Sequence, residues 1–256
     1  MLFAIDIGNT NIHLGMFEGD TLSNTFDIST KNEHSSSEYS MIFKLVLKEH
    51  GYDLTSIEGA IVSCVVPKIN KLVREALEKI TNAPIISVGP GIKTGFSIRL
   101  DDPAELGADL VANTASAIKE VGYPCIIVDF GTATTVSVVN EKKEFVGCSI
   151  MPGIQMSLDA LHNTGLLPSV STDILVNSIG KNSINAMRSG VYSGTVLACE
   201  GFIDSFKNEL KLPKDTKIVV SGGSAKELIP LFKNKVSYIP NLTLKGLNVI
   251  YSLNKR

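Results

Sequence analysis

Short apolar runs separated by polar turns open the chain and predict an antiparallel start to a sheet. The expected strands lie near residues 2–6, 11–18 and 21–28, with Glu18-Gly19-Asp20 as the turn between the last two. Further on, strand-like and helix-like segments alternate. Strands are expected at 57–66 and 85–88, and helices near 38–50 and 67–82. This alternation predicts a mixed sheet covered by helices.

Local signals define where these first helices begin. Ser35 and Glu38 have the spacing of a capping box, and Pro67 fits the first turn of the second helix. A further helix is expected to open at Pro103 and to run to about Val121. It would carry Glu105, Asp109 and Asn113 on one face, because these residues are four positions apart.

The second half of the chain repeats the alternation. The expected strands lie near 125–129, 134–140, 144–150 and 217–221. The expected helices follow Pro152-Gly153, cover about 181–210, follow Gly222-Gly223, and begin at about Leu242. A mixed sheet with helices is therefore expected here as well.

One motif occurs twice in equivalent surroundings. Asp6-Ile7-Gly8-Asn9-Thr10 and Asp129-Phe130-Gly131-Thr132 each follow a buried-strand run and precede another strand, and they are 129 − 6 = 123 residues apart. A single copy is ordinary turn chemistry. The pair predicts a duplicated α/β fold with lobes at 1–118 and 119–256 and a nucleotide cleft between them.

The residue types of this motif suit a nucleoside triphosphate. Glycine lets backbone N–H groups approach a phosphate, threonine adds a hydroxyl donor, and aspartate can hold a cation that bridges phosphate oxygens. The sequence has no G-x-x-x-x-G-K-[ST] motif, so a P-loop is not available for this role.

Two further glycine segments are candidates for close approach to a ligand. Gly107-Ala108-Asp109 is expected on a helix, where glycine costs about 1 kcal/mol relative to alanine. Asp109 would accept a proton from a substrate hydroxyl, although a solvated acidic helix face is an alternative. Ser221-Gly222-Gly223 follows a strand-like run and could approach an adenine ring or a phosphate.

Composition narrows the classes of function. The 256 residues are 44% hydrophobic and 20% charged, with a net charge of −2, which provides no basic field for nucleic acid or an anionic membrane. The four cysteines are far apart, lack zinc spacing and read as reduced core residues. No signal peptide or membrane span is evident, so a cytoplasmic location is expected.

The motifs together resemble the type III pantothenate kinases of the actin-like ATPase superfamily. Besides the segments above, the resemblance rests on four others in matching order: Pro90-Gly91-Ile92-Lys93-Thr94-Gly95, Pro152-Gly153-Ile154, Gly180-Lys181-Asn182-Ser183 and Pro240-Asn241-Leu242-Thr243-Leu244-Lys245-Gly246-Leu247. It implies a homodimeric enzyme of coenzyme A biosynthesis that transfers the ATP γ-phosphate to pantothenate. The implied cofactors are ATP, Mg²⁺ or another divalent ion, and K⁺ or NH₄⁺.

The resemblance also implies roles for individual residues. Asp109 would be the general base, Asp129 would bind the monovalent cation, and Asp6 would belong to the Mg²⁺ environment. The implied ATP-binding residues are Asp6, Ile7, Gly8, Asn9, Thr10, Asn11, Ile12, His13 and Thr132. The implied substrate-binding positions are Leu100, Gly107, Ala108, Asp109, Leu110 and Ser183.

Three of the substrate positions depart from the family pattern. Leu110 stands where the family usually has arginine, and Leu100 stands where it usually has tyrosine. Ser183 replaces a usual threonine and keeps the hydroxyl. Loss of a hydrogen bond to a charged group costs about 1.5–3 kcal/mol, so the two leucines are expected to weaken pantothenate binding.

Three hypotheses follow. The first is an ATP-dependent pantothenate kinase, a function that Asp6, Asp109 and Asp129 favour. The second is a nucleotide-binding paralogue with weak or altered kinase activity and a regulatory role or modified substrate, which Leu100 and Leu110 favour. The third is another small-alcohol kinase or phosphatase of the same superfamily, against which the Gly-Ala-Asp segment argues.

Overall fold

The computed structural model describes residues 1–30, 34–165, 168 and 177–255, and the chain forms two compact units. The first unit contains Met1–Gly95, Asp101–Lys119 and Leu242–Arg256; the second contains Phe96–Leu100 and Glu120–Asn241. Two segments belong to a different unit from the residues next to them in the chain. The C-terminal helix returns to the first unit, and residues 96–100 join the second.

The first unit is built on a five-stranded mixed sheet. Its order is β3 (Thr21–Ser29), β2 (Asn11–Glu18), β1 (Leu2–Ile7), β4 (Gly59–Cys64) and β5 (Ile85–Ser87). Strand β1 is antiparallel to β2 and parallel to β4. The buried side chains of Phe3, Ile5 and Ile7 alternate along β1 and belong to one apolar core. The predicted strands of this half are therefore present, with ends that differ by a few residues.

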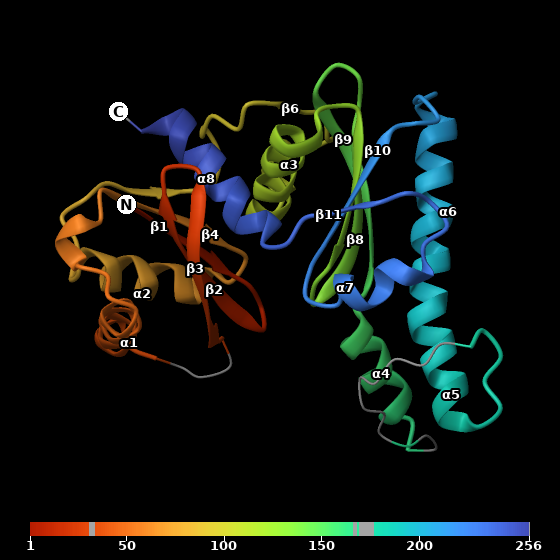
Figure 1. The fold of residues 1–256 in the computed structure, drawn as a ribbon. Helices are drawn as coiled ribbons and strands as arrows, with labels where there is room; N and C mark the ends of the chain where they lie inside the picture. The colour runs from red at the N-terminus through yellow and green to blue at the C-terminus, as the bar shows by residue number, and fades with distance from the viewer. Residues whose placement is uncertain (31–33, 166–167, 169–176, 256) are drawn as a thin grey trace. The chain divides into compact units, whose positions relative to one another are not determined.

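The described residues of this unit also form the α-helices α1 (Ser36–Glu49), α2 (Pro67–Glu78), α3 (Ala108–Val121) and α8 (Leu242–Asn254), together with 3₁₀ turns at Leu54–Ser56 and Pro103–Glu105. Helices α1 and α2 pack on the core, and α8 contacts β1, β2 and β4 (Figure 1). The predicted capping box is confirmed, since the Ser35 hydroxyl accepts from the Glu38 N–H and the Glu38 carboxylate accepts from the Ser35 N–H. Pro67 occupies the first turn of α2, as predicted.

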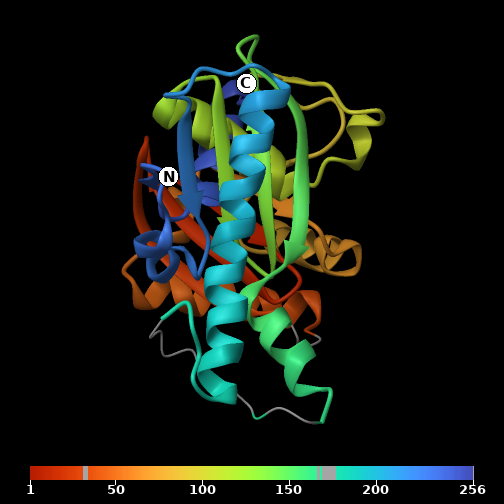
Figure 2. The same ribbon diagram turned by 90° about the vertical axis from the view of Figure 1, so that its right-hand side faces the viewer.

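The second unit is built on a six-stranded mixed sheet. Its order is β11 (Ser237–Tyr238), β10 (Lys217–Ser221), β7 (Cys125–Phe130), β8 (Ala133–Val139), β9 (Glu144–Pro152) and β6 (Ser97–Ile98). The helical elements are α4 (Ile154–His162), α5 (Ser183–Arg188), a π-helical turn (Ser189–Ser193), α6 (Gly194–Glu209), α7 (Ala225–Leu228) and a 3₁₀ turn (Ile229–Leu231). Helix α6 runs along one face of this sheet and buries Val196, Cys199 and Ile203 in its core (Figure 2).

The two sheets repeat one topology. The order β3-β2-β1-β4-β5 in the first corresponds strand by strand to β9-β8-β7-β10-β11 in the second, with the same parallel and antiparallel pairings. Even the register irregularity recurs, at Met16/Phe17 in β2 and at Val138/Val139 in β8. The duplication predicted from the repeated motif is therefore confirmed in the fold.

The helix predicted to begin at Pro103 is wrong in its first turn. Residues Pro103–Glu105 form a separate 3₁₀ turn that Asp102 caps by accepting from the Ala104 N–H, and α3 starts only at Ala108. Glu105 is thus not on α3, whereas Asp109 and Asn113 are. Gly107 precedes the helix, and its carbonyl accepts from the Val111 N–H. The expected cost of a glycine inside a helix does not arise at this position.

Helices α3 and α8 approach each other closely at Gly246. A Cβ atom at this position would collide with the carbonyl group of Ala112 on α3. Thr243 at the start of α8 also donates a hydrogen bond of 2.7 Å to the Asn113 side chain. The C-terminal helix is therefore attached to α3 by backbone contact and by a partly buried hydrogen bond.

We expect Gly246→Ala to destabilise the protein by about 1–3 kcal/mol, because the added methyl has no space. The matched control is Gly201→Ala on α6, where a Cβ meets no atom within 4 Å. The control should stabilise by about 0.5–1 kcal/mol, since alanine restricts the unfolded chain and favours helix. Urea denaturation of both variants measures the two effects, and equal stability would contradict the close packing.

Candidate functional site

The first candidate turn joins β1 to β2 and is held at both of its ends. The Gly8 N–H donates to the Asn11 carbonyl at 3.0 Å, which closes the turn. Thr30, just after β3, donates its hydroxyl to the Gly8 carbonyl and its N–H to the Thr10 carbonyl, both at 2.9 Å. Asn9 at the tip is exposed. The result is a fixed turn with an accessible tip, as a phosphate-binding loop requires.

Strand alternation divides the predicted ATP-binding residues between two faces of the sheet. Ile7 and Ile12 are fully buried in the apolar core, so only their backbone is available to a ligand. Asp6 and His13 are paired across β1 and β2 and therefore share the opposite face. Asp6 is 8% exposed. Its carboxylate lies directly before the turn, where a cation next to a phosphate would need it.

His13 has a partner that the sequence did not reveal. Its Nδ1 lies 2.5 Å from Oδ1 of Asp27, its register neighbour on β3. Because a carboxylate only accepts, Nδ1 carries the proton in this contact. The side chains are 47% and 66% exposed, so the pair contributes little to stability. It orients the imidazole beside the first turn.

The second candidate turn joins β7 to β8 and is one residue shorter. Its Gly131 N–H donates to the Ala133 carbonyl at 3.2 Å, and Gly131 and Thr132 are both exposed. Asp129, at the end of β7, is half-buried. It occupies the place that Asp6 has in the first sheet, since β7 corresponds to β1.

Two glycine segments pack directly against this second turn. A Cβ at Gly153, which precedes α4, would collide with the carbonyl of Thr132, and the Gly153 N–H donates to that same carbonyl at 3.1 Å. Gly222 has φ +98°, and a Cβ there would lie 2.5 Å from the Phe130 backbone. The close approach expected at the Gly222 turn is thus made by the protein's own backbone.

A pairing of aspartate with serine also repeats between the sheets. Asp6 on β1 is in register with Ser63 on β4, and Asp129 on β7 is in register with Ser221 on β10. Both serines are buried, at 0% and 3% exposure. Ser63 was not predicted from the sequence, although the matching strand ends Val62-Ser63 and Val220-Ser221 were a usable signal.

The predicted general base lies at the start of α3. Asp109 is the second residue of this helix, and its Oδ1 accepts from the Leu110 N–H at 2.8 Å. A Cβ at Gly107 would lie 2.5 Å from that oxygen, so glycine leaves the space that the carboxylate occupies. Ala108 begins the helix, and Leu110 is half-buried on it.

The remaining substrate positions are in the second unit. Leu100 is half-buried just after β6, and its neighbour Arg99 forms an ion pair of 2.9 Å with Glu144. Ser183 is exposed as the first residue of α5, which Asn182 caps by accepting from the Asn185 N–H. Arg99 is thus engaged by a carboxylate.

A family model described as type III pantothenate kinase matches residues 2–205, which is most of the chain. The chain belongs to the type III pantothenate kinase family. The resemblance inferred from the motifs is therefore confirmed. Membership supports a nucleotide-binding transferase of the kinase class that uses ATP and a divalent metal.

Solved structures show the same fold at low sequence identity. A protein from Campylobacter jejuni described as a Baf family transcriptional activator is 17% identical, with 98% of each chain covered and a TM-score of 0.61. The Acidaminococcus fermentans (R)-2-hydroxyglutaryl-CoA dehydratase component A is 13% identical, with 98% of this chain and 96% of that chain covered and a TM-score of 0.57. The chain thus has an actin-like fold.

The turns of this family member suit the phosphates and metal of such a reaction. Asp6 offers hard carboxylate oxygen, and the turns present backbone N–H groups other than those of Gly8 and Gly131, which close the turns. Within the described residues, no group of three or more histidine, cysteine or acidic side chains could hold a metal by itself. Nor is any described helix long and apolar enough to span a membrane.

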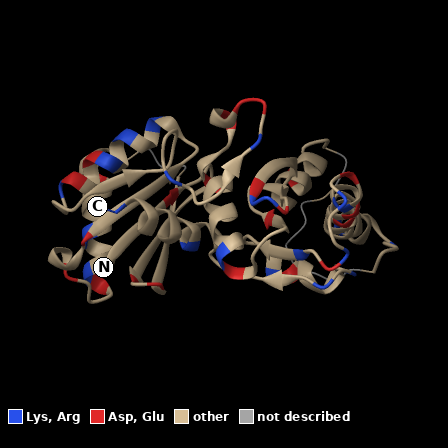
Figure 3. Ribbon diagram, turned by 90° about the horizontal axis from the view of Figure 1, so that it is seen from above, with Lys and Arg blue, Asp and Glu red and all other residues tan. Residues whose placement is uncertain are grey.

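Two of the four cysteines, Cys125 and Cys199, are buried as expected, whereas Cys64 and Cys148 are only half-buried and are not core residues. Lys and Arg are interspersed with Asp and Glu along the ribbon (Figure 3). All four cysteines are free, and burial raises the pKa of the Cys125 and Cys199 thiols to about 12. These two side chains stay protonated at neutral pH and act as core residues.

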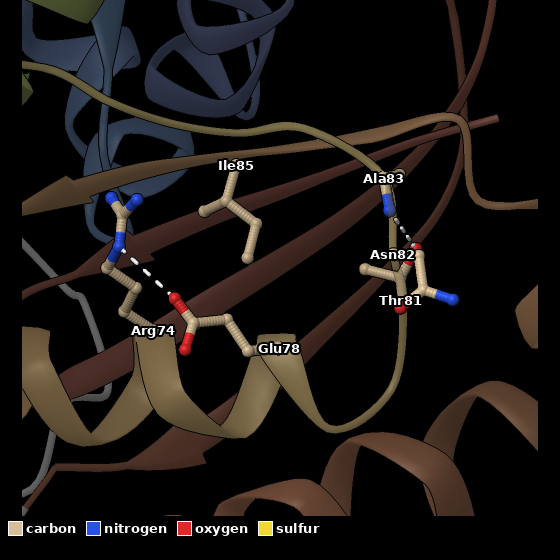
Figure 4. Close-up of a pocket in the computed structure, with 6 residues that line it drawn as sticks. All are labelled: Arg74, Glu78, Thr81, Asn82, Ala83 and Ile85. Carbon is tan, nitrogen blue, oxygen red and sulfur yellow. Dashed lines mark hydrogen bonds and ion pairs between the residues drawn. The ribbon is translucent and has the colours of Figure 1, made fainter.

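A surface cavity of about 310 Å³ lies away from all the predicted positions. It is lined by Arg74, Glu78, Thr81, Asn82, Ala83 and Ile85 (Figure 4). Arg74 lies 3.6 Å from the Glu78 carboxylate and donates to the Ser87 hydroxyl at 3.2 Å. Its charge is thus balanced by a neighbouring carboxylate, and the lining presents no catalytic group.

We expect Gly153→Ala to weaken ATP binding at least tenfold, because the added Cβ displaces the Thr132 turn against which Gly153 packs. Gly194→Ala at the start of α6 is the control, since a Cβ there meets nothing within 4 Å. Isothermal titration with ATP measures both variants. Unchanged affinity of folded Gly153→Ala would show that this turn does not contact the nucleotide.

Proposed function

We propose that this protein transfers the γ-phosphate of ATP to the primary hydroxyl of pantothenate and forms 4′-phosphopantothenate, the first step of coenzyme A biosynthesis. The observation that carries the proposal is the match to the type III pantothenate kinase model over residues 2–205. The two glycine turns support it, because they have the backbone geometry and the aspartates that phosphoryl transfer needs.

The two glycine turns bind the phosphates of ATP in this proposal. Asn9, Thr10 and Thr132 bind phosphate oxygens through N–H and hydroxyl groups, while the Gly8 and Gly131 N–H groups close the turns. Asp6 faces the divalent ion. When bound, this ion neutralises charge on the β- and γ-phosphates. Asp6 is mostly buried, so its carboxylate is fixed for this task. Positioning of the two substrates and compensation of the phosphate charges then provide most of the rate enhancement.

Asp109 takes the proton from the acceptor. One carboxylate oxygen is engaged by the Leu110 N–H, and the other makes no hydrogen bond to a described residue. In the proposed step the hydroxyl oxygen forms a bond to the γ-phosphorus while the bond from that phosphorus to the β–γ bridging oxygen breaks. The hydroxyl proton moves to Asp109, and ADP leaves.

We expect Asp109→Asn to lower turnover by roughly 10²–10⁴-fold, since asparagine keeps the shape and cannot take the proton. Glu105→Gln is the control, because Glu105 lies on the separate 3₁₀ turn. A coupled assay of ADP formation with pantothenate measures kcat, and titration with ATP checks binding. Near-normal turnover of Asp109→Asn would remove Asp109 from this role.

We further propose that Asp129 binds a monovalent cation next to the phosphates. Activity should then be higher in K⁺ or NH₄⁺ than in Na⁺, and Asp129→Ala should lose both the cation dependence and most of the rate. The measurement is initial rate against cation concentration at constant ionic strength. Equal rates of the unmodified protein in Na⁺ and K⁺ would contradict this assignment.

The two leucines make a separate prediction about substrate choice. Leucine cannot bind a carboxylate, so discrimination between pantothenate and an uncharged amide analogue should be small. Leu110→Arg should lower the KM for pantothenate more than that for the amide, because only the carboxylate gains a bidentate partner. The ratio of kcat/KM for pantothenate to kcat/KM for the amide, measured for the unmodified protein and for Leu110→Arg, gives this discrimination. An unchanged ratio would place Leu110 outside the carboxylate site and favour a different acceptor.

A further inference from the structure

Ser63 has a buried hydroxyl for which the fold provides no partner. It is the fifth residue of β4 and is fully buried. Its Oγ makes no hydrogen bond to any residue in the described part of the chain. A buried hydroxyl without a partner is costly, whereas alanine would fill the same space without that cost. The Ser63 hydroxyl is therefore available to bind a ligand.

The position of Ser63 indicates what that partner is. Ser63 is in register with Asp6 on the neighbouring parallel strand, so both side chains leave the same face of the sheet. Adjacent strands lie about 4.8 Å apart, which lets two short side chains reach one small ion. A carboxylate and a hydroxyl are both hard oxygen donors of the kind Mg²⁺ prefers.

Asp6 brings a negative charge to the paired ends of β1 and β4. A cation bound here would be attracted by that charge, and the neutral Ser63 hydroxyl would add a ligand without adding charge.

The same arrangement exists in the second sheet. Ser221 is buried and in register with Asp129, the residue that the proposed function assigns to a monovalent cation. The rest of the two strand ends differs, with Cys64-Val65 after one serine and Gly222-Gly223 after the other. The two strand ends share an aspartate carboxylate in register with a serine hydroxyl.

We propose that Ser63 positions the divalent cation together with Asp6, either by direct contact or through one of the ion's water molecules. The inference rests on the proposed function for its choice of ion, and it deepens that function by adding a residue to the metal environment. Asp6 supplies the charge. Ser63 supplies a hydroxyl oxygen at a fixed place and so restricts where the ion lies relative to the first turn.

The test measures Mn²⁺ binding directly, by electron paramagnetic resonance of free Mn²⁺, without nucleotide or pantothenate. Ser63→Ala should bind Mn²⁺ at least tenfold more weakly than the unmodified protein, in the range seen for changes around metal ligands. Its melting temperature should be equal or higher, because an unpartnered hydroxyl is removed. Asp6→Asn should bind Mn²⁺ more weakly still.

Ser116→Ala is the matched control. Ser116 on α3 is 1% exposed, and its Oγ also lacks a hydrogen-bond partner among the described residues, but it has no register pairing with an aspartate. Its removal should leave Mn²⁺ affinity unchanged. Ser63→Cys provides a second check, because a thiol in the ion's environment should raise the affinity for Cd²⁺ relative to Mn²⁺.

Unchanged Mn²⁺ affinity in Ser63→Ala, or an unchanged Cd²⁺ to Mn²⁺ ratio in Ser63→Cys, would overturn the proposal. So would Mn²⁺ binding that survives Asp6→Asn, since the ion would then lie elsewhere. These outcomes are independent of the acceptor. If the protein binds Mn²⁺ through Ser63 but does not phosphorylate pantothenate, the role of Ser63 is supported and the proposed function is rejected.

Discussion

The ladder of backbone hydrogen bonds between β1 and β2 ends at a glycine turn, and so does the ladder between β7 and β8. The position at which each ladder ends determines which residues are available to bind a ligand. Asp6 and Asp129 are the last polar side chains of their strands, and the glycines two positions later free the backbone for close approach. Thr30 in one unit and Gly153 in the other then fix the turns from outside.

The hairpins could be predicted from the sequence because all their information is local. An apolar run, a polar turn with glycine and a second run lie within about fifteen residues, and both the capping box at Ser35 and the proline at Pro67 are local as well. The family match and the common strand order of the two sheets confirm the fold inferred from these signals.

What the sequence did not reveal depends on contacts between distant segments. The pairing of Asp6 with Ser63 requires the register of two strands 57 residues apart, since 63 − 6 = 57. The return of α8 to the first unit depends on the close contact between Gly246 and Ala112. The break before α3 was missed because the caps formed by Asp102 and Gly107 compete with a continuous helical pattern.

The fold alone does not establish the reaction, since proteins with this fold include a dehydratase component and a protein described as a transcriptional activator. The central claim is chemical and has a direct test in ³¹P nuclear magnetic resonance of the protein with MgATP, K⁺ and pantothenate. We predict that the ATP γ-phosphate signal is replaced by a phosphomonoester signal, and only when pantothenate is present. Release of inorganic phosphate alone, or no change in ATP, would contradict the account.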